Sequence, residues 1–239
     1  MSTQLRSLNM HVTQPFTCAY LANKSTRLMM LVEPFQNANT YYPILLQNGF
    51  RRSGEQIYRP DCEQCQECQS LRINVSEFIL SRSQKRLLNK NQHFKVKISK
   101  KNKPEYFSLY QRYIDTIHKD GDMYPATYEQ YSGFLASVWC DMIFIEIYDD
   151  KKLIAVSVTD KIGTLPNSAW SAVYCFYDPL YQSVSLGKFA ILKQLALAKD
   201  LNIEYLYLGY YIKNCQKMNY KTQFNPHQRF INGLWLSFD

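Results

Sequence analysis

The sequence lacks the long apolar segments that mark membrane and secreted proteins. No stretch reaches the roughly 18 consecutive apolar residues of a membrane-spanning helix, and residues 1–16 contain no apolar core of a signal peptide. The number of cysteines, seven, is odd, which argues against a framework made only of disulfides. We therefore predict a cytoplasmic protein with reduced thiols.

Several catalytic signatures are absent as well. There is no glycine-rich phosphate-binding loop and no Ser/His/Asp pattern, and the four histidines show no metal-ligand spacing. We therefore predict no nucleotide cofactor and no covalent nucleophile, and the sequence leaves the catalytic residues unassigned. Asp160 and Asp178 are the two carboxylates considered as a general base, and both are interpreted as structural.

The charge is unbalanced toward lysine and arginine. There are 28 basic and 20 acidic residues, which gives a net charge of +8. A basic surface attracts anionic partners, of which nucleic acid is the most common. The 19 tyrosines suit either a partly polar binding groove or an ordinary core, because each combines an apolar ring with a hydroxyl.

The segment KISKKNKP (residues 97–104) is charged and ends in proline, which favours a domain boundary. We predict a basic, cysteine-bearing domain at residues 1–100 and a second domain at residues 101–239. The elements predicted in the first domain are a helix at 38–47, a hairpin at 50–59 with its turn at Ser53-Gly54, a strand at 70–78 and a basic helix at 81–90.

The order of elements in the second domain indicates an α+β fold. The predicted elements are helices at 105–119 and 127–138 (N-cap Thr127), strands at 142–148, 153–161 and 169–176, a helix at 185–200 (N-cap Ser185), and a strand at 203–208. This order resembles the GNAT acyltransferases, in which two strands separate to admit an acyl donor. We therefore predict a GNAT-like acyltransferase core with an N-terminal cysteine-bearing domain. The GNAT donor loop is incomplete, with only Gly187 present, which argues against acetyl-CoA.

A cluster of cysteines is the sharpest local motif. Cys62, Cys65 and Cys68 form two successive Cys-x-x-Cys steps, whose thiolates can converge on one metal centre. Cys18 is the candidate fourth ligand, since it is the remaining cysteine of the first domain. Zinc and an iron–sulfur cluster both fit this spacing, and reduced structural cysteines are the alternative. Two further cysteines, Cys140 and Cys175, are interpreted as core residues, and Cys215 is left undecided.

Two segments favour contacts with nucleic acid. Arg82, Lys85, Arg86 and Lys90 lie on one basic helix, and lysines continue from residue 95 to residue 103. Such a surface binds phosphates with little sequence preference and with a strong dependence on salt. In residues 205–221, tyrosines alternate with lysines, so rings can stack on bases while lysines contact phosphates.

Longer runs of sequence resemble one enzyme family. YRPDCEQCQECQSLRINVSEF (residues 58–78), SRSQKR (81–86), AVYCFYDP (172–179), SLGKFAILKQ (185–194) and YLYLGYYIKNCQKMNYKTQFNP (205–226) are similar, in this order, to the arginyl/leucyl-tRNA–protein transferases. The resemblance implies transfer of leucine or arginine from aminoacyl-tRNA to the N-terminal Asp or Glu of acceptor proteins, which marks them for N-degron degradation. The bacterial branch, which the short chain resembles, transfers leucine.

This resemblance gives roles to the basic residues. An acidic N-terminal side chain calls for a cationic clamp, and arginine binds carboxylate bidentately. The acceptor-binding candidates are Arg72, Arg82 and Arg86. The candidates for binding the tRNA and its aminoacyl end are Tyr210, Tyr211, Lys213, Lys217, Tyr220 and Lys221. The predicted partners are aminoacyl-tRNA and acceptor proteins with acidic N-termini, and no membrane.

Three alternatives remain on the sequence alone. The first is a GNAT enzyme that uses acyl-CoA, and the second is a non-catalytic, metal-bearing RNA-binding module. The third is redox sensing through residues 62–68, which is compatible with catalysis.

Overall fold

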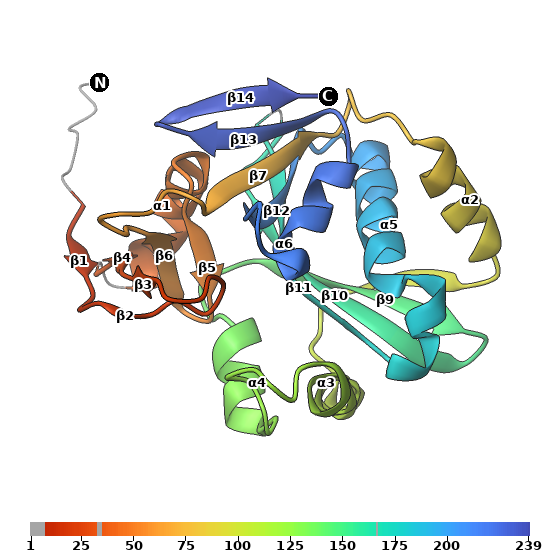
Figure 1. Ribbon diagram of the computed structural model, residues 1–239. Helices are drawn as coiled ribbons and strands as arrows, with labels where there is room; N and C mark the ends of the chain where they lie inside the picture. Colours follow the sequence, from red (N-terminus) through yellow and green to blue (C-terminus); the bar gives the residue numbers. More distant parts are fainter. Residues whose placement is uncertain (1–7, 33–34, 166) are drawn as a thin grey trace.

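The computed structural model describes residues 8–32, 35–165 and 167–239. Its centre is a mixed eight-stranded sheet in the order β14-β13-β7-β12-β11-β10-β9-β8 (Figure 1). The strands of this large sheet are β7 (Gln69–Asn74), β8 (Lys95–Ser99), β9 (Met142–Asp149), β10 (Lys152–Ile162), β11 (Ala169–Tyr177), β12 (Tyr205–Tyr211), β13 (His227–Ile231) and β14 (Leu234–Phe238). Neighbours are antiparallel except β11 and β12, which are parallel. The predicted mixed α/β class is confirmed.

A second, small sheet forms from the N-terminal segment. Its four strands lie in the order β1-β4-β6-β5, beside the helix α1 (Phe35–Gln47) (Figure 1). They are β1 (Met10–Val12), β4 (Leu28–Leu31), β5 (Arg51–Ser53) and β6 (Gln56–Pro60), and a separate pair consists of β2 (Phe16–Thr17) and β3 (Ser25–Thr26). The predicted helix and β5–β6 hairpin are confirmed. The strands before residue 32 were not predicted, because they are too short to show an alternating pattern.

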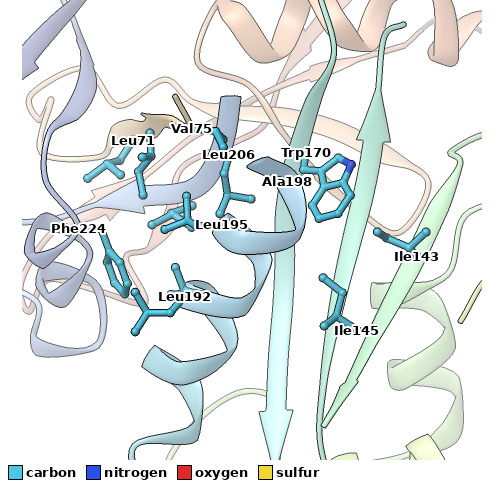
Figure 2. Packing of buried hydrophobic residues seen from close by; sticks show 13 residues of the cluster. Leu71, Val75, Ile143, Ile145, Trp170, Leu192, Leu195, Ala198, Leu206 and Phe224 are labelled. Carbon is cyan, nitrogen blue, oxygen red and sulfur yellow. The ribbon is translucent and has the colours of Figure 1, made fainter. Parts of the chain in front are cut away.

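One face of the large sheet is covered by α5 (Leu186–Asp200), with α2 (Arg82–Lys90) packed beside it (Figure 1). Leu192, Leu195 and Ala198 point from α5 to the sheet, where they meet Leu206 and Trp170 (Figure 2). Each of these side chains is almost fully buried, which stabilises the layer by roughly 1.5–3 kcal/mol for each large side chain. The apolar stripe predicted for residues 185–200 therefore faces the sheet.

Part of the opposite face is covered by α3 (Pro104–Ile117) and α4 (Tyr128–Leu135). Aromatic rings dominate this layer: Tyr110 and Tyr131 both contact Phe176 of β11, with ring centroids 5.6 and 6.3 Å apart. Thr127 caps α4 as predicted, since its side chain accepts a hydrogen bond from the backbone of Gln130.

Two local predictions are corrected. Residues 95–99, partly within the predicted linker, form β8 at the edge of the large sheet, where exposed lysines discourage pairing with another chain. Because β7 and β8 both precede residue 100, that position is not a boundary of the sheet. Ser185 stands at the N-cap of α5, but with φ 54° and no side-chain capping bond.

The strands β11 and β12 separate soon after they meet. Their parallel ladder joins residues 169–171 to residues 205–207, and beyond it, among the strands that the structure describes, β11 pairs with β10 and β12 with β7. Gly209 lies at a bulge of β12 with φ +84°, a conformation that suits glycine. Short helical turns complete the chain: η1 (Pro179–Val184), α6 (Gln216–Asn219) and η2 (Tyr220–Gln223). In the described residues, no helix has the length and apolar character needed to span a membrane.

Candidate functional site

A cavity of about 590 Å³ lies between the small sheet and the end of β12. Its wall combines residues far apart in the sequence, among them Met30, Tyr58, Tyr210 and Phe230. The sulfur-bearing part of the wall consists of Cys18, Cys62, Cys65 and Cys68. The fold therefore brings the predicted cysteine ligands to the same cavity as one of the predicted tRNA-end tyrosines.

The four cysteines are close enough to influence one another. Burial, followed by the neighbouring thiols Cys62, Cys18 and Cys65, raises the pKa of the Cys68 thiol to about 12. Cys62 Sγ lies 3.3 Å from Thr26 Oγ1. Within the part of the chain that the structure describes, however, no set of three or more His, Cys, Asp or Glu side chains is arranged to hold a metal ion.

The other cysteines differ in burial. Cys215 is the most buried of the seven, with 9% of its surface exposed. Cys140 and Cys175, interpreted from the sequence as core residues, are only partly buried and pack at the margins of apolar clusters. That interpretation is corrected accordingly.

The predicted aromatic and basic segment divides into exposed and buried residues. Lys213 and Lys217 are exposed, whereas Tyr211 and Tyr220 are partly buried. Tyr210 is buried, and its hydroxyl donates a hydrogen bond to the Gly49 carbonyl over 3.0 Å. The two exposed lysines are therefore placed where they can meet phosphates directly.

Lys221 is buried instead, with 7% of its surface exposed. Its ammonium donates a hydrogen bond of 2.6 Å to the carbonyl of Tyr210. Burial, together with the charge of Arg51, lowers the pKa of Lys221 to about 7. Lys221 therefore does not meet phosphates at the surface, and the sequence alone does not distinguish a buried lysine from an exposed one.

Arg51, which the sequence analysis did not single out, lies beside Lys221. Its Nη2 donates a hydrogen bond of 2.8 Å to the carbonyl of Ala172, the first β11 residue after the ladder with β12. A Cβ placed on Gly209 would lie 3.5 Å from Lys221 Nζ and 3.6 Å from Arg51 Nη2, so both cations border this glycine. The sequence feature that could have drawn attention to Arg51 is the pair of adjacent arginines in β5.

The three acceptor-binding candidates do not form one clamp. Arg72 lies on β7, where its guanidinium donates hydrogen bonds to Gln228 and Tyr207 and stacks on the Tyr205 and Trp235 rings. By contrast, Arg82 and Arg86 are exposed on α2, which lies on the far side of α5 from the small sheet (Figure 1). The spacing in sequence did not reveal that α5 separates the two groups.

Both carboxylates considered as general bases have structural partners. Asp160 is fully buried and pairs with Arg52 at 2.6 Å, and it also accepts a hydrogen bond from the Tyr42 hydroxyl. Asp178 pairs with Lys152 at 2.9 Å and accepts a bond from the backbone of Leu180. This geometry agrees with the structural interpretation of both residues.

Comparison with known proteins places the chain in a family. The family described as "Arginine-tRNA-protein transferase, C terminus" matches residues 105–231, and its N-terminal counterpart matches residues 16–86. An aspartate/glutamate leucyltransferase of Pseudoalteromonas atlantica is 46% identical over 94% of this chain and 95% of its own. Those of Aeromonas hydrophila and Pseudomonas fluorescens are 45% identical (97% of this chain, 96% of the relative) and 44% identical (99% and 100%).

A solved structure, L-PGS from Bacillus licheniformis, shares 8% identity with a TM-score of 0.40 over 74% of this chain and 52% of that one, which is too low to assign a fold. The family matches and the near full-length relatives are sufficient without it. The chain therefore belongs to the arginine-tRNA–protein transferase family and is an aminoacyltransferase.

Proposed function

We propose that this enzyme transfers leucine from leucyl-tRNA to the N-terminal Asp or Glu of acceptor proteins. The observation that carries the proposal is the similarity, along nearly the whole chain, to relatives named aspartate/glutamate leucyltransferase. The family description mentions arginine, but the three relatives named above carry the leucine name, and this favours leucine as the donor. In the cell, leucylation marks the acceptor for degradation, and the need for charged tRNA favours a reaction in the cytoplasm.

The chemistry needs no covalent enzyme intermediate. The acceptor's α-amine attacks the ester carbonyl of the leucyl-tRNA, the bond between that carbon and the ribose oxygen breaks, and the amine proton leaves while the ribose hydroxyl is restored. An α-amine has a pKa of about 7.7–8, so much of it is neutral near pH 7.5. Orientation of the two substrates and stabilisation of the developing oxyanion then supply the catalysis.

The separation of β11 and β12 is the proposed place of reaction. Where the ladder ends, β11 and β12 no longer pair with each other, and Arg51 and Lys221 bind the carbonyls of Ala172 and Tyr210 there. Tyr210, next to this point, lines the cavity. Strands that part to admit a donor are the feature of the GNAT-like core that we propose for residues 101–239, with the cysteine-bearing segment before it.

The tRNA meets the enzyme through exposed basic residues. From residue 78 to residue 104 the sequence contains lysines and arginines but no acidic residue, and most of these cations are exposed on α2 and β8. We assign the tRNA body to this basic strip, including Arg82 and Arg86, and the 3′ end to Lys213 and Lys217 with Tyr211 and Tyr220. Phosphate contacts of this kind give sequence-independent affinity.

The cysteines at the cavity are proposed to hold zinc or an iron–sulfur cluster. Thiolates are the preferred ligands of both, and Cys18, Cys62, Cys65 and Cys68 line one cavity wall. Because the thiols are neighbours without forming a coordination sphere in the described residues, the ion would draw them together. Its contribution would be to fix the 62–68 loop against the small sheet.

The proposal is tested by transfer of radiolabelled leucine, and separately arginine, from charged tRNA to peptides that begin with Asp, Glu or Ala. Leucine on the Asp and Glu peptides alone is the expected result. Arginine on the same peptides would retain the reaction but change the donor. No transfer of either amino acid by folded protein would favour the acyl-CoA or RNA-binding alternatives, which acetyl-CoA calorimetry and binding of uncharged tRNA then distinguish.

A further inference from the structure

Two buried cations lie next to each other without an acidic partner among the residues that the structure describes. Arg51 is 5% exposed and Lys221 is 7% exposed. In the residues for which the structure gives side-chain positions, neither of them forms an ion pair with a carboxylate. Their hydrogen-bond partners are neutral: the carbonyls of Ala172 and Tyr210, and the sulfur of Met218. Burial of unpaired charge is unfavourable, so this arrangement calls for an anion.

Arg51 also has a buried hydrogen-bond donor that no described residue of the chain accepts. Its Nη1 is buried and has no hydrogen-bond partner within the described part of the protein. Arg52, the next residue, shows the usual arrangement: its guanidinium is fully buried and forms a bidentate pair with Asp160. The contrast between adjacent arginines shows that, within the described residues, Arg51 has a buried donor left for an incoming anion.

Neighbours of this pair of cations line the cavity. Tyr58, the ladder partner of Arg51, and Tyr210, whose carbonyl holds Lys221, both line the cavity. Ser70, which pairs with Tyr210 in the sheet, lines it too, and its buried hydroxyl has no partner among the described residues. Because Arg51 and Lys221 are not themselves among the lining residues, access to them from the cavity requires a side-chain movement, and rotamer changes are common on binding.

We propose that Arg51 and Lys221 form the recognition site for the side-chain carboxylate of the acceptor's N-terminal Asp or Glu. This inference rests on the proposed function and adds the residues that read the acidic side chain. A carboxylate matches the site because it carries a permanent negative charge and accepts the planar donors of arginine. The site lies where β11 leaves β12, so a bound acidic residue has its α-amine next to the proposed place of reaction.

The test compares acceptor peptides that differ only in charge, at saturating leucyl-tRNA. Asp is paired with Asn, and Glu with Gln, as the first residue. Arg51→Gln is expected to lower the kcat/KM ratio of the Asp to the Asn peptide by about 10- to 150-fold, the effect of losing a hydrogen bond to a charged group. The KM for leucyl-tRNA stays unchanged. Arg51→Lys, which keeps the charge, retains part of the preference.

Arg59→Gln is the matched control. Arg59 also lines the cavity, but its guanidinium donates to the carbonyl of Asn48 and stacks on Phe50. This variant is expected to keep the wild-type Asp-to-Asn ratio. If Arg59→Gln abolishes the preference for the Asp over the Asn peptide and Arg51→Gln keeps it, the recognition site is at Arg59 and the proposal is wrong. Equal losses for the Asp and Asn peptides in Arg51→Gln, or a raised KM for tRNA, would also overturn the assignment.

A second measurement uses the wild-type protein, in case Arg51→Gln does not fold. The dipeptides Asp-Ala and Asn-Ala are compared as ligands in thermal denaturation and as competitors of leucine transfer. A larger rise in Tm and stronger competition by Asp-Ala are expected, and equal effects of the two dipeptides would contradict the proposal. Failure of the proposed function is a different result, because the wild-type enzyme would then transfer leucine to none of the peptides.

Discussion

Arg52 and Asp160 form a bidentate ion pair in which both side chains are completely buried. Arg52 Nε lies 2.8 Å from Asp160 Oδ2, and Nη2 lies 2.6 Å from Oδ1. The pair links the β5–β6 hairpin of the small sheet to β10 in the large sheet. Arg52 also donates hydrogen bonds to the carbonyls of Gly54 and Leu135, so its guanidinium joins three parts of the chain.

Removal of Arg52 should therefore destabilise the protein strongly. Arg52→Met leaves Asp160 buried without a counter-charge, and we expect a loss of about 3–5 kcal/mol in the free energy of unfolding, measured by urea denaturation. Arg27→Met removes a partner of the exposed Glu63 and should change stability by less than about 1 kcal/mol. Equal effects of the two substitutions would show that the buried pair does not hold the sheets together.

Substitution of the exposed arginines of α2 should weaken tRNA binding in a salt-dependent way. For the double variant Arg82→Gln/Arg86→Gln, we expect the slope of log K against log salt to decrease in magnitude by about 0.7–0.9 for each phosphate that is no longer neutralised. Lys151→Gln, at the exposed β9–β10 turn, is the control and should leave the slope unchanged. An unchanged slope in the double variant, together with a weaker preference for acidic acceptors, would show that these arginines bind the acceptor protein, as the sequence analysis predicted, and not the tRNA.

The cysteine site predicts a change in metal content. Cys65→Ser removes one of the thiols at the cavity and should lower the zinc or iron bound by purified protein, measured by mass spectrometry of the elements. Cys140→Ser, away from the cavity wall, is the control. Metal content equal to wild type in Cys65→Ser would exclude Cys65 as a ligand.

His227 should make stability depend on pH. Its pKa is lowered from 6.5 to about 4, first by burial and then by the charge of Arg229. The unfolded chain therefore binds a proton between pH 6.5 and 4 that the folded chain does not, and stability falls as the pH falls through this window. The expected slope is at most about 1.4 kcal/mol per pH unit.

Comparison of variants isolates this contribution. In His227→Gln, the part of the slope due to His227 should be missing. Denaturation curves at several pH values between 4 and 7 would measure it. Parallel stability profiles for wild type and His227→Gln would contradict the account.

Much of the secondary structure is predictable from local patterns. The hairpin at residues 50–59, the helix that Thr127 caps and the long α5 follow from turn residues, capping residues and periodicity, and all three are observed. The strands β13 and β14 were missed, and β8 fell partly within the predicted linker. In β8 the charged residues belong to a sheet edge, and a sequence does not distinguish an exposed edge strand from a linker.

The candidate site is less predictable, because burial depends on the assembled fold. The cysteine motif pointed to one cavity wall, but Lys221 resembled its exposed neighbours Lys213 and Lys217 in sequence. Arg51 and Arg52 are adjacent, yet within the described residues Arg52 pairs with a carboxylate and Arg51 does not. Only the placement of β5 against β10 and β11 separates their roles.

The most direct test of the central claim is to sequence an acceptor peptide after incubation with the enzyme and leucyl-tRNA. Tandem mass spectrometry of a peptide that begins with Asp should show one leucine joined by a peptide bond to the α-amine, and an N-acetylated copy of the peptide should remain unmodified. Free leucine without a modified peptide, or an unchanged pool of leucyl-tRNA, would contradict the assignment of this enzyme as a leucyltransferase.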